Sequence, residues 1–146
     1  MNNSNPADPT FNLEGKQFLI VDDDPIIRMV MSSMFKKWQN TTIEMVNDGS
    51  QALKKLQQSY FDLIIMDLNM PVLNGYQTAK AIREGFCGEF YKKIPIIAIT
   101  ADLSEMAKTQ TVLMDNVLTK PFNNESLHTA IHGCLFSEMR LSVDAS

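Results

Sequence analysis

The chain has 146 residues, of which 45% are hydrophobic and 21% are charged, and its net charge at pH 7 is −4. This length favours a single domain, and this composition is ordinary for a globular protein with a core of its own. An acidic chain with a pI near 5.1 argues against a nucleic-acid-binding surface, which is normally basic. No apolar run approaches the length that spans a bilayer, so we expect no membrane contact by this chain.

The first residues and the cysteines indicate the cellular setting. The opening MNNS lacks the basic and apolar segments of a secretory signal. Cys87 and Cys134 lack the spacing of a disulfide framework or a metal site, so we expect two reduced thiols in a cytoplasmic protein. Residues 1–14 are polar and contain two prolines, which predicts a flexible arm. The domain is predicted over residues 15–137, and residues 138–146 are predicted to form a C-terminal tail.

The first predicted elements are a strand and a capped helix. The apolar run Gln17–Val21 predicts a strand that stops at Asp22. Asp24 is a good N-cap, and Pro25 suits the first position of a helix. Apolar residues then recur at helical spacing as far as Trp38, so a helix follows this strand directly.

A second and a third strand follow. Residues Thr42–Val46 alternate between apolar and polar, as a strand at the edge of a sheet does. Residues 48–58 predict a capped helix. The run Leu63–Met66 is apolar throughout, which predicts a strand covered on both faces, and this run ends in an acid, Asp67.

The second half of the chain repeats the alternation. A helix is predicted over residues 74–83, followed by a loop with three aromatic residues over residues 84–93. Residues 94–100 predict another apolar strand, and a weaker helix is predicted over about residues 103–111. A short strand is predicted over Asn116–Thr119 and is followed by a last helix.

Five alternations of strand and helix predict the fold class. Such a chain forms a parallel sheet with helices on both faces. The wholly apolar strands belong at the centre of the sheet, and the half-polar strand Thr42–Val46 belongs at an edge. Right-handed crossovers around a central first strand give the order 2-1-3-4-5. We therefore predict an α/β fold with a doubly wound, five-stranded parallel sheet of the flavodoxin-like type.

Polar residues follow the carboxyl ends of four of these strands. In such a sheet, ligands bind outside the carboxyl ends, at the switch point between strands 1 and 3. Each of these residues alone is commonly a turn former or a helix cap, as Asp24 is expected to be. Together, with Asp24 set aside as a helix cap, they place three carboxylates, a hydroxyl and an ammonium group on one rim. The residues are Asp22, Asp23 and Asp24 after strand 1, Asp67 and Asn69 after strand 3, Thr100 at the end of strand 4 and Lys120 after strand 5.

The electrostatics of this rim point to a cation and a phosphoryl group. Carboxylates ~4 Å apart repel one another by about 4 kcal/mol per pair at an effective dielectric constant of ~20. A bound cation or protonation offsets that repulsion, and carboxylate and carbonyl oxygens suit Mg²⁺. A magnesium site beside a lysine and a hydroxyl suits a phosphoryl group, and Asp67 could then act as a nucleophile that forms an acyl phosphate.

Four segments of the chain match a known family. The segments FLIVDDDP, DLIIMDLNMPVLNGYQTAKAIR, IPIIAITA and LTKPF resemble the receiver domain of two-component response regulators. This family includes the receiver domains at the ends of hybrid histidine kinases, and MDNVLTKPF resembles that subclass in particular. The resemblance covers about residues 15–137 and implies the receiver fold.

The resemblance implies a role for each residue of the rim. Asp67 would be the phosphoacceptor. Asp23 and Asp67 would bind Mg²⁺ directly, together with the backbone carbonyl of Asn69, and Asp22 would act through a metal-bound water. Lys120 would hold a phosphoryl oxygen.

Further positions are implied in the same way. Thr100 would move in to hydrogen-bond the phosphoryl group, and the Lys120–Pro121 peptide bond is expected to be cis. Ala101 is small, as a crowded site requires, and Gly75 would permit the turn into the third helix.

The chain departs from the family pattern at three places. The family often has an aromatic residue three positions before the site lysine, whereas this chain has Val117. The family often has a glycine before the last strand, where this chain has Leu113 in the sequence VLMDN. Asn74 stands where aspartate is common, a mild change because both residues cap helices. The resemblance therefore supplies no aromatic partner for a movement of Thr100.

The resemblance also implies partners and an output. The phosphoryl group would come from a histidine kinase or a histidine phosphotransfer protein. Phosphorylation would shift a population of conformations at the surface formed by helix 4, strand 5 and helix 5, which could also form a homodimer. The protein would assist its own phosphorylation and dephosphorylation and would not otherwise be an enzyme.

Two other functions are compatible with parts of the sequence. The Asp22-x-Asp24 pair resembles the opening motif of haloacid-dehalogenase-type phosphatases, in which Asp22 would be the nucleophile and Asp24 the acid. Against this, Ile26 stands where Thr or Val is usual, no acidic pair follows Lys120, and the chain has no room for a substrate cap. The second is a binding module that is never phosphorylated, but such a module has no reason to gather repelling charges.

Two groups of aromatic side chains have more than one interpretation. His128 and His132 lie one turn apart on the last predicted helix, where we expect them to flank buried residues and not to form a metal pair or a phosphotransfer site. Phe86, Phe90 and Tyr91 would either form an exposed contact patch or fold inward over their own loop.

Overall fold

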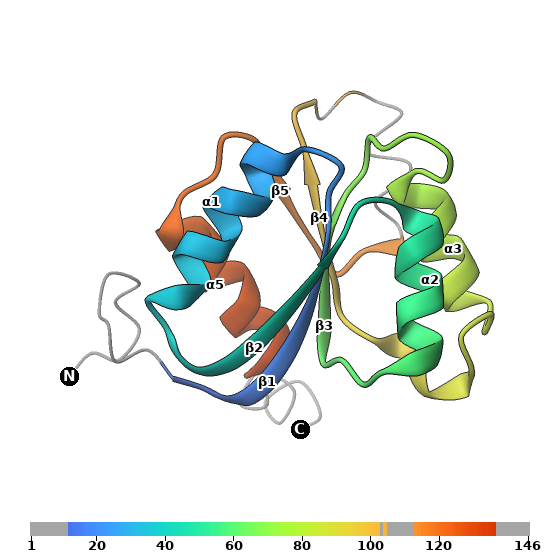
Figure 1. Ribbon diagram of the computed structural model, residues 1–146, viewed down its shortest axis with the longest axis horizontal. Coiled ribbons are helices and arrows are strands. Elements are labelled where there is room, and N and C mark those ends of the chain that lie inside the picture. The colour runs from blue at the N-terminus through green and yellow to red at the C-terminus, as the bar shows by residue number, and fades with distance from the viewer. Residues whose placement is uncertain (1–11, 103, 105–112, 137–146) are drawn as a thin grey trace, which may run out of the picture.

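A five-stranded parallel sheet between two layers of helices forms the described part of the protein (Figure 1). The computed structural model describes residues 12–102, 104 and 113–136. The strand order is β2-β1-β3-β4-β5, which confirms the predicted fold and order. The strands are β1 (Asn12–Val21), β2 (Gln39–Val46), β3 (Leu63–Asp67), β4 (Ile96–Thr100) and β5 (Asn116–Thr119).

Two pairs of helices cover the two faces of this sheet. In Figure 1, α1 and α5 lie on one side and α2 and α3 on the other. The bounds of these helices are α1 (Pro25–Lys36), α2 (Gly49–Gln58), α3 (Gly75–Arg83) and α5 (Asn124–Leu135). Each face therefore has its own hydrophobic core, one formed around Phe18, Phe35 and Ile131 and the other around Leu19, Leu56 and Ile82.

The central strands are buried on both faces, as their apolar runs predicted. Every residue of β3 and of β4 is buried. Val21 pairs with Met66, and Asp67 pairs with Ile99, so the carboxyl ends of β1, β3 and β4 are level with one another. The residues that follow these strands are thus brought to one edge of the sheet.

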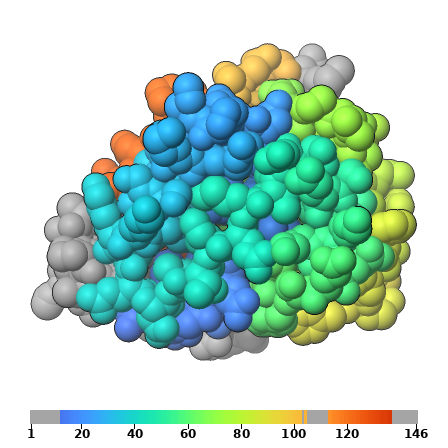
Figure 2. All heavy atoms as spheres, in the orientation of Figure 1, coloured from blue at the N-terminus to red at the C-terminus, as the bar shows by residue number. Residues whose placement is uncertain are grey.

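The strand β2 lies at the edge of the sheet, in agreement with its alternating sequence. Its exposed residues alternate with partly buried ones over most of its length. In the space-filling view, the residues of β2 reach the surface between α1 and α2 (Figure 2).

Three of the described helices begin at the capping residue that the sequence predicted. The side chain of Asp24 accepts a hydrogen bond from the backbone N–H of Ile26, and Pro25 occupies the first turn. Asp48, Asn74 and Asn123 cap α2, α3 and α5 in the same manner. Because the cap fixes where a helix starts, these residues also fix the length of the loops that follow the strands.

The bounds of several predicted elements need correction, among them β2, which starts at Gln39 and not at Thr42. Strand β1 starts at Asn12 and not at Gln17, so residues 12–14, assigned above to the arm, belong to the sheet. Leu13 is buried and Asn12 pairs with β2, but the left-handed conformations of Glu14 and Gly15 interrupt the strand, which explains why the apolar pattern missed it. Strand β4 starts at Ile96, and residues 89–93 of the predicted loop form a 3₁₀ helix. The helix predicted at 103–111, most of the arm and the tail lie outside the described residues.

The aromatic groups differ from the simplest expectation. His128 is buried and not merely at the flank of α5, and its ring stacks on that of His132 with centroids 6.0 Å apart. The aromatic loop is divided, because Tyr91 is buried and donates a hydrogen bond to the carbonyl of Ser59, whereas Phe86 and Phe90 are exposed. Among the described residues, no helix is long and apolar enough to cross a membrane.

Arg83 ties together the segments at the amino ends of β4 and β5. Its guanidinium donates to the carbonyls of Leu113, Lys92 and Ile94 at 2.7–3.1 Å. It also forms an ion pair with Asp115 at 3.0 Å, and Asp115 accepts a further hydrogen bond from the first residue of β4. The side chain of Arg83 is 19% exposed, so these bonds are partly shielded from water.

Replacement of Arg83 by methionine should lower the free energy of unfolding by about 2–3 kcal/mol, because three carbonyls and a carboxylate lose a charged donor. Urea unfolding followed by the fluorescence of Trp38, the single tryptophan, measures this loss. Lys80→Met is the matched control on the same helix, since the ion pair of Lys80 with Glu84 is more than half exposed and should contribute less than about 0.5 kcal/mol. Equal losses in the two variants would contradict the prediction.

Candidate functional site

Three carboxylates meet at the carboxyl end of the sheet. Asp22 and Asp23 follow β1, and Asp67 is the last residue of β3. One carboxylate oxygen from each of the three lies within 4.8 Å of the others. Asp22 and Asp67 are buried, with 1% and 3% of their surface exposed, while Asp23 is exposed. The structure thus brings together the three acids that the sequence placed on one rim.

The two buried carboxylates are held differently at each oxygen. One oxygen of Asp22, Oδ1, accepts a hydrogen bond of 2.9 Å from the N–H of Asp24. The other, Oδ2, is buried without a hydrogen bond and faces Lys120 Nζ at 3.7 Å. In Asp67, Oδ1 accepts a hydrogen bond of 3.1 Å from the N–H of Asn69, and Oδ2 lies 3.5 Å from Lys120 Nζ. Each carboxylate therefore keeps one oxygen toward the lysine.

Lys120 is brought to the acids by the end of β5. Its backbone N–H donates to the carbonyl of Thr100 at 2.8 Å, which continues the β4–β5 ladder beyond Thr119. The Lys120–Pro121 peptide bond is cis, as the resemblance implied. Of the described cations, Lys120 forms ion pairs with both Asp22 and Asp67.

Burial sets the proton affinity of the two inner acids. The pKa of Asp22 is raised to about 6, because desolvation and, to a smaller extent, the negative charge of Asp67 outweigh the lowering effect of the Asp24 N–H. Desolvation also raises the pKa of Asp67, against the opposing effects of the Asn69 N–H and of Lys120. One ammonium group is thus insufficient to compensate the burial of two carboxylates beside a third.

Thr100 stands at the end of β4 with its hydroxyl engaged outside the acidic cluster. Its Oγ1 donates to the carbonyl of Asp102 at 3.0 Å and accepts from the N–H of the same residue at 3.1 Å. The hydroxyl therefore holds the turn after β4 in this structure. The residue is buried, and its strand lies next to that of Asp67.

Gly75 passes close behind Asp67. Its N–H donates to the carbonyl of Leu68 at 3.1 Å. A Cβ at position 75 would lie 2.5 Å from the carbonyl oxygen of Asp67 and 2.8 Å from the Cα of Leu68. The start of α3 can approach the end of β3 this closely only because residue 75 has no side chain.

The donor set of the cluster fits a hard divalent cation. Three carboxylates and one ammonium leave a net charge of about −2 in a partly buried site. The buried Oδ2 of Asp22, which has no hydrogen bond, is an oxygen for which the described residues supply no donor. Oxygen donors and uncompensated negative charge are the features that Mg²⁺ requires of a protein site.

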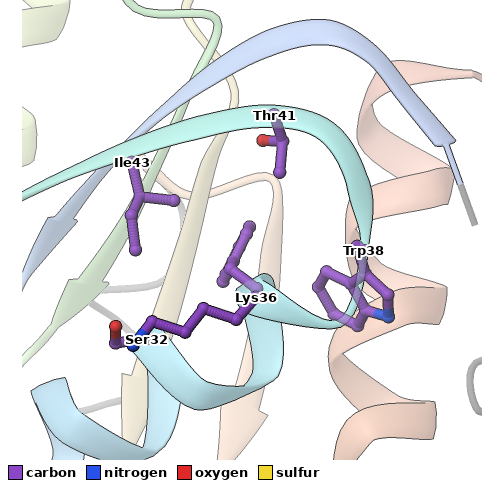
Figure 3. Close-up of a pocket in the computed structure, with 6 residues that line it drawn as sticks. Ser32, Lys36, Trp38, Thr41 and Ile43 are labelled. Atoms are coloured by element: carbon purple, nitrogen blue, oxygen red, sulfur yellow. The ribbon is translucent and has the colours of Figure 1, made fainter. Parts of the chain in front are cut away.

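A hollow elsewhere on the surface does not contribute to this cluster. It has a volume of about 300 Å³ and lies between α1 and β2 (Figure 3). Figure 3 shows Ser32 and Lys36 on its helix side and Thr41 and Ile43 on its strand side, with Trp38 at one end. None of the lining residues belongs to the acidic cluster.

Arg28 is a residue near the cluster that the sequence patterns did not single out. Its Nη1 donates to the backbone carbonyl of Asp22 at 2.7 Å. A signal was present, since Arg28 is the one charged residue between Pro25 and Phe35. Helical periodicity alone assigns such a residue to the solvent-exposed side.

A family model matches most of the chain. The model of the response regulator receiver domain covers residues 18–132. The chain belongs to this family. It is a receiver domain of the kind found in two-component and phosphorelay systems. The phosphatase alternative is not favoured, and in the structure the side chain of Asp24, its expected acid, is used to cap α1.

Curated relatives include sensor kinases and smaller proteins. The receiver domain is 32% identical over 127 residues to the autoinducer 2 sensor kinase/phosphatase LuxQ of Vibrio vulnificus, a match that covers 86% of this chain and 14% of LuxQ. It is 36% identical over 122 residues to hybrid signal transduction histidine kinase A of Dictyostelium discoideum, covering 80% of this chain and 6% of that protein. It is 33% identical over 120 residues to protein PilG of Pseudomonas aeruginosa, covering 81% and 86%. The chain thus spans only a small part of the two kinases.

Solved structures share the fold of this receiver domain. The receiver domain of a sensor histidine kinase from Pseudomonas aeruginosa PAO1, with a magnesium ion coordinated in its active site cleft, superposes with a TM-score of 0.74 at 30% identity, covering 82% of this chain and 97% of that one. The response regulator TrrA of Thermotoga maritima, in complex with Mg²⁺ and BeF, superposes with a TM-score of 0.72 at 29% identity, covering 82% and 99%. Both of these neighbours therefore bind Mg²⁺, the first of them in its active site cleft.

The stability of the metal-free receiver domain should depend on the proton at Asp22. The pKa of this carboxyl is higher in the folded state, about 6, than its ordinary value of 3.8, so the folded protein takes up a proton as the pH falls and is stabilised by it. Between pH 7 and pH 5 this gain is about 1 kcal/mol. Asp22→Asn, which is neutral throughout, should be more stable than the wild type at pH 7, and the difference should narrow at pH 5. Urea unfolding in EDTA measures both, and a difference that widens toward pH 5 would contradict the sign.

Gly75→Ala should destabilise the protein by about 1–3 kcal/mol, because the added methyl group overlaps the backbone of Asp67 and Leu68. The amide resonances of residues 67 and 68 should shift as β3 and α3 separate. Gly133→Ala in α5 is the matched control, since a Cβ there has no atom within 4 Å, and alanine should stabilise the helix by up to about 1 kcal/mol. Unfolding midpoints in urea that change equally in the two variants would refute the packing argument.

Proposed function

We propose that Asp67 accepts a phosphoryl group from a phosphohistidine and that Lys120 and Thr100 stabilise the product. The observation that carries this proposal is the position of Asp67, a buried carboxylate at the end of β3 within 3.5 Å of an ammonium group and within 4.8 Å of two further acids. A carboxylate in this setting has a nucleophilic oxygen and a compensating cation beside it.

The transfer exchanges one bond to phosphorus for another. An oxygen of Asp67 attacks the phosphorus of the phosphohistidine, the P–N bond breaks as the P–O bond forms, and the imidazole nitrogen leaves with the electron pair of the broken bond. The product is an acyl phosphate on Asp67. The attacking carboxylate must be ionised. Burial raises the pKa of Asp67 and so disfavours its ionised form, whereas the positive charge of Lys120 favours that form. One acceptor residue takes one phosphoryl group, so the chain is a signalling substrate and not a turnover enzyme.

Asp22, Asp23 and Asp67, with the carbonyl of Asn69, would hold Mg²⁺. Asp23 and Asp67 would be direct ligands, and Asp22 would act through a bound water. When bound, this ion supplies positive charge for the oxygens of the phosphoryl group. Oδ2 of Asp22 is buried and directed toward the cluster. The ammonium group of Lys120 forms ion pairs with this oxygen and with Oδ2 of Asp67.

The hydroxyl of Thr100 connects the phosphoryl group to the output. In the structure it bonds to Asp102 at 3.0 Å, in the turn that leads toward residues 103–112. A phosphoryl oxygen on Asp67 would compete with the carbonyl of Asp102 for this hydroxyl. Loss of the bond between Thr100 and Asp102 would free the turn. The output surface would be formed by the helix predicted at 103–111, β5 and α5, and this surface could also support a homodimer. Val117, which is partly buried in β5, stands where an aromatic residue often takes part in such a switch.

The donor would be a histidine kinase or a histidine phosphotransfer protein. Three apolar residues at the start of α1 are exposed beside the acidic cluster, namely Ile26, Met29 and Val30, with 65%, 68% and 39% of their surface accessible. An apolar face on the helix that directly follows Asp22 and Asp23 would allow a protein surface to seat its phosphohistidine over the site. A receiver domain whose sheet starts at Asn12, acting in the cytoplasm, fits this role.

Transfer of labelled phosphate tests the proposal. The full chain, incubated with Mg²⁺ and labelled acetyl phosphate or a phosphorylated donor protein, should incorporate label, and Asp67→Asn should reduce the incorporation by at least about 100-fold. Asp24→Asn is the matched control, because asparagine caps a helix as well as aspartate does, and this variant should be labelled normally. Label that persists in Asp67→Asn and disappears in Asp22→Asn or Asp24→Asn would overturn the proposal in favour of the phosphatase-like arrangement.

A further inference from the structure

Arg28 contacts the backbone of the acidic cluster from within α1. It lies one turn into the helix, half-buried, among apolar neighbours. Its Nη1 donates to the carbonyl of Asp22 with a distance of 2.7 Å, the shortest hydrogen bond described around the cluster. A guanidinium is charged at all ordinary pH values, so this donor is always present.

The carbonyl that Arg28 holds belongs to the peptide group between Asp22 and Asp23. The N–H of Asp22 is bonded to Val46 in β2 at 3.2 Å, which fixes the chain before this peptide. Beyond it, Asp23 is exposed, and no hydrogen bond described for the chain holds its carboxylate. The bond from Arg28 holds the carbonyl of this peptide group, and the bond of 2.9 Å from the N–H of Asp24 to Oδ1 of Asp22 holds the chain after it. Together they restrict the direction in which Asp23 extends.

We propose that Arg28 is a positioning residue for the cation site. By holding the Asp22–Asp23 peptide, it directs the exposed carboxylate of Asp23 toward the buried carboxylates of Asp22 and Asp67. This inference rests on the proposed function, because it assigns the cluster a cation. The residues that orient a metal ligand commonly change metal affinity by about 10- to 100-fold when they are removed.

The test compares Mg²⁺ binding by variants of the full chain. Isothermal titration calorimetry should give a Kd for Mg²⁺ that is about 10- to 100-fold higher in Arg28→Gln than in the wild type. Arg28→Lys retains a charged donor without the fork of the guanidinium, so its Kd should lie between the two. In the metal-free protein, the amide resonance of Asp23 should shift in Arg28→Gln and move back toward its wild-type position in Arg28→Lys. An Mg²⁺ affinity that changes less than twofold in Arg28→Gln would overturn the proposal.

Arg83→Gln is the matched control. It also removes an arginine that donates to backbone carbonyls, including a bond of 2.7 Å to Ile94, but it does so at the opposite end of the sheet. This variant should lose stability and keep the wild-type affinity for Mg²⁺. If both variants weaken Mg²⁺ binding in proportion to their loss of stability in urea, Arg28 has only a general structural role and the proposal fails.

Two further measurements distinguish a failure of the proposed role of Arg28 from a failure of the proposed function. Asp67→Asn that is still phosphorylated would refute the proposed function, whereas the Mg²⁺ titration of Arg28→Gln does not depend on phosphorylation. Arg28 also lies beside the exposed Ile26 and Met29, where a donor protein would approach. If Arg28→Gln binds Mg²⁺ normally and reacts normally with acetyl phosphate but accepts no phosphoryl group from a donor protein, Arg28 is a contact for that protein and the positioning role is refuted.

Discussion

Asp22 and Asp67 lie almost out of contact with water, with Asp23 beside them, and a single ammonium group faces the buried pair at 3.5 and 3.7 Å. Like charges this close repel by several kcal/mol per pair, and burial removes the water that would screen them. Burial raises the pKa of both buried acids, and the neighbouring negative charges raise it further. A divalent cation adds two positive charges and would bring the sum of three carboxylates and one lysine to about zero. The rest of the site depends on this excess of negative charge in the metal-free cluster.

The sheet is what makes such an arrangement possible. Val21 pairs with Met66 and Asp67 with Ile99, so three strands end level with one another and their next residues cannot move apart. Two separate hydrophobic cores hold these strands from either face. The free energy of burying apolar side chains along the strands, about 25 cal/mol per Å² of apolar surface, opposes the repulsion at their ends. A loop-based site could relax by separating its charges, whereas this one retains them.

Much of the fold followed from the sequence because its signals are local. Apolar runs identified the central strands, alternation identified β2, and Asp24, Asp48 and Asn74 marked three helix starts. The three acids and Lys120 were placed on one rim because parallel strands share a carboxyl end, and the structure brings them together. The sequence did not show the start of β1, where left-handed residues interrupt the strand, or the burial of His128. Nor did it show the contacts of Arg28 and Arg83, since hydrogen bonds from a side chain to a distant carbonyl leave no periodic trace.

The two arginines show how the ends of the sheet differ. Arg83 binds three carbonyls and Asp115 at the amino ends of β4 and β5. All four partners are oxygen acceptors for its positively charged guanidinium, and these bonds hold the segments together. Among the described residues, the guanidinium of Arg28 makes one hydrogen bond, to the peptide between two acids, at the end where charges of the same sign are gathered. A bond at the first end can stabilise only the fold, whereas a bond at the second also sets the direction of a carboxylate. Since backbone geometry, and not a side-chain contact, directs Asp23 toward the cluster, the precision of the cation site would depend on a residue that never touches the cation.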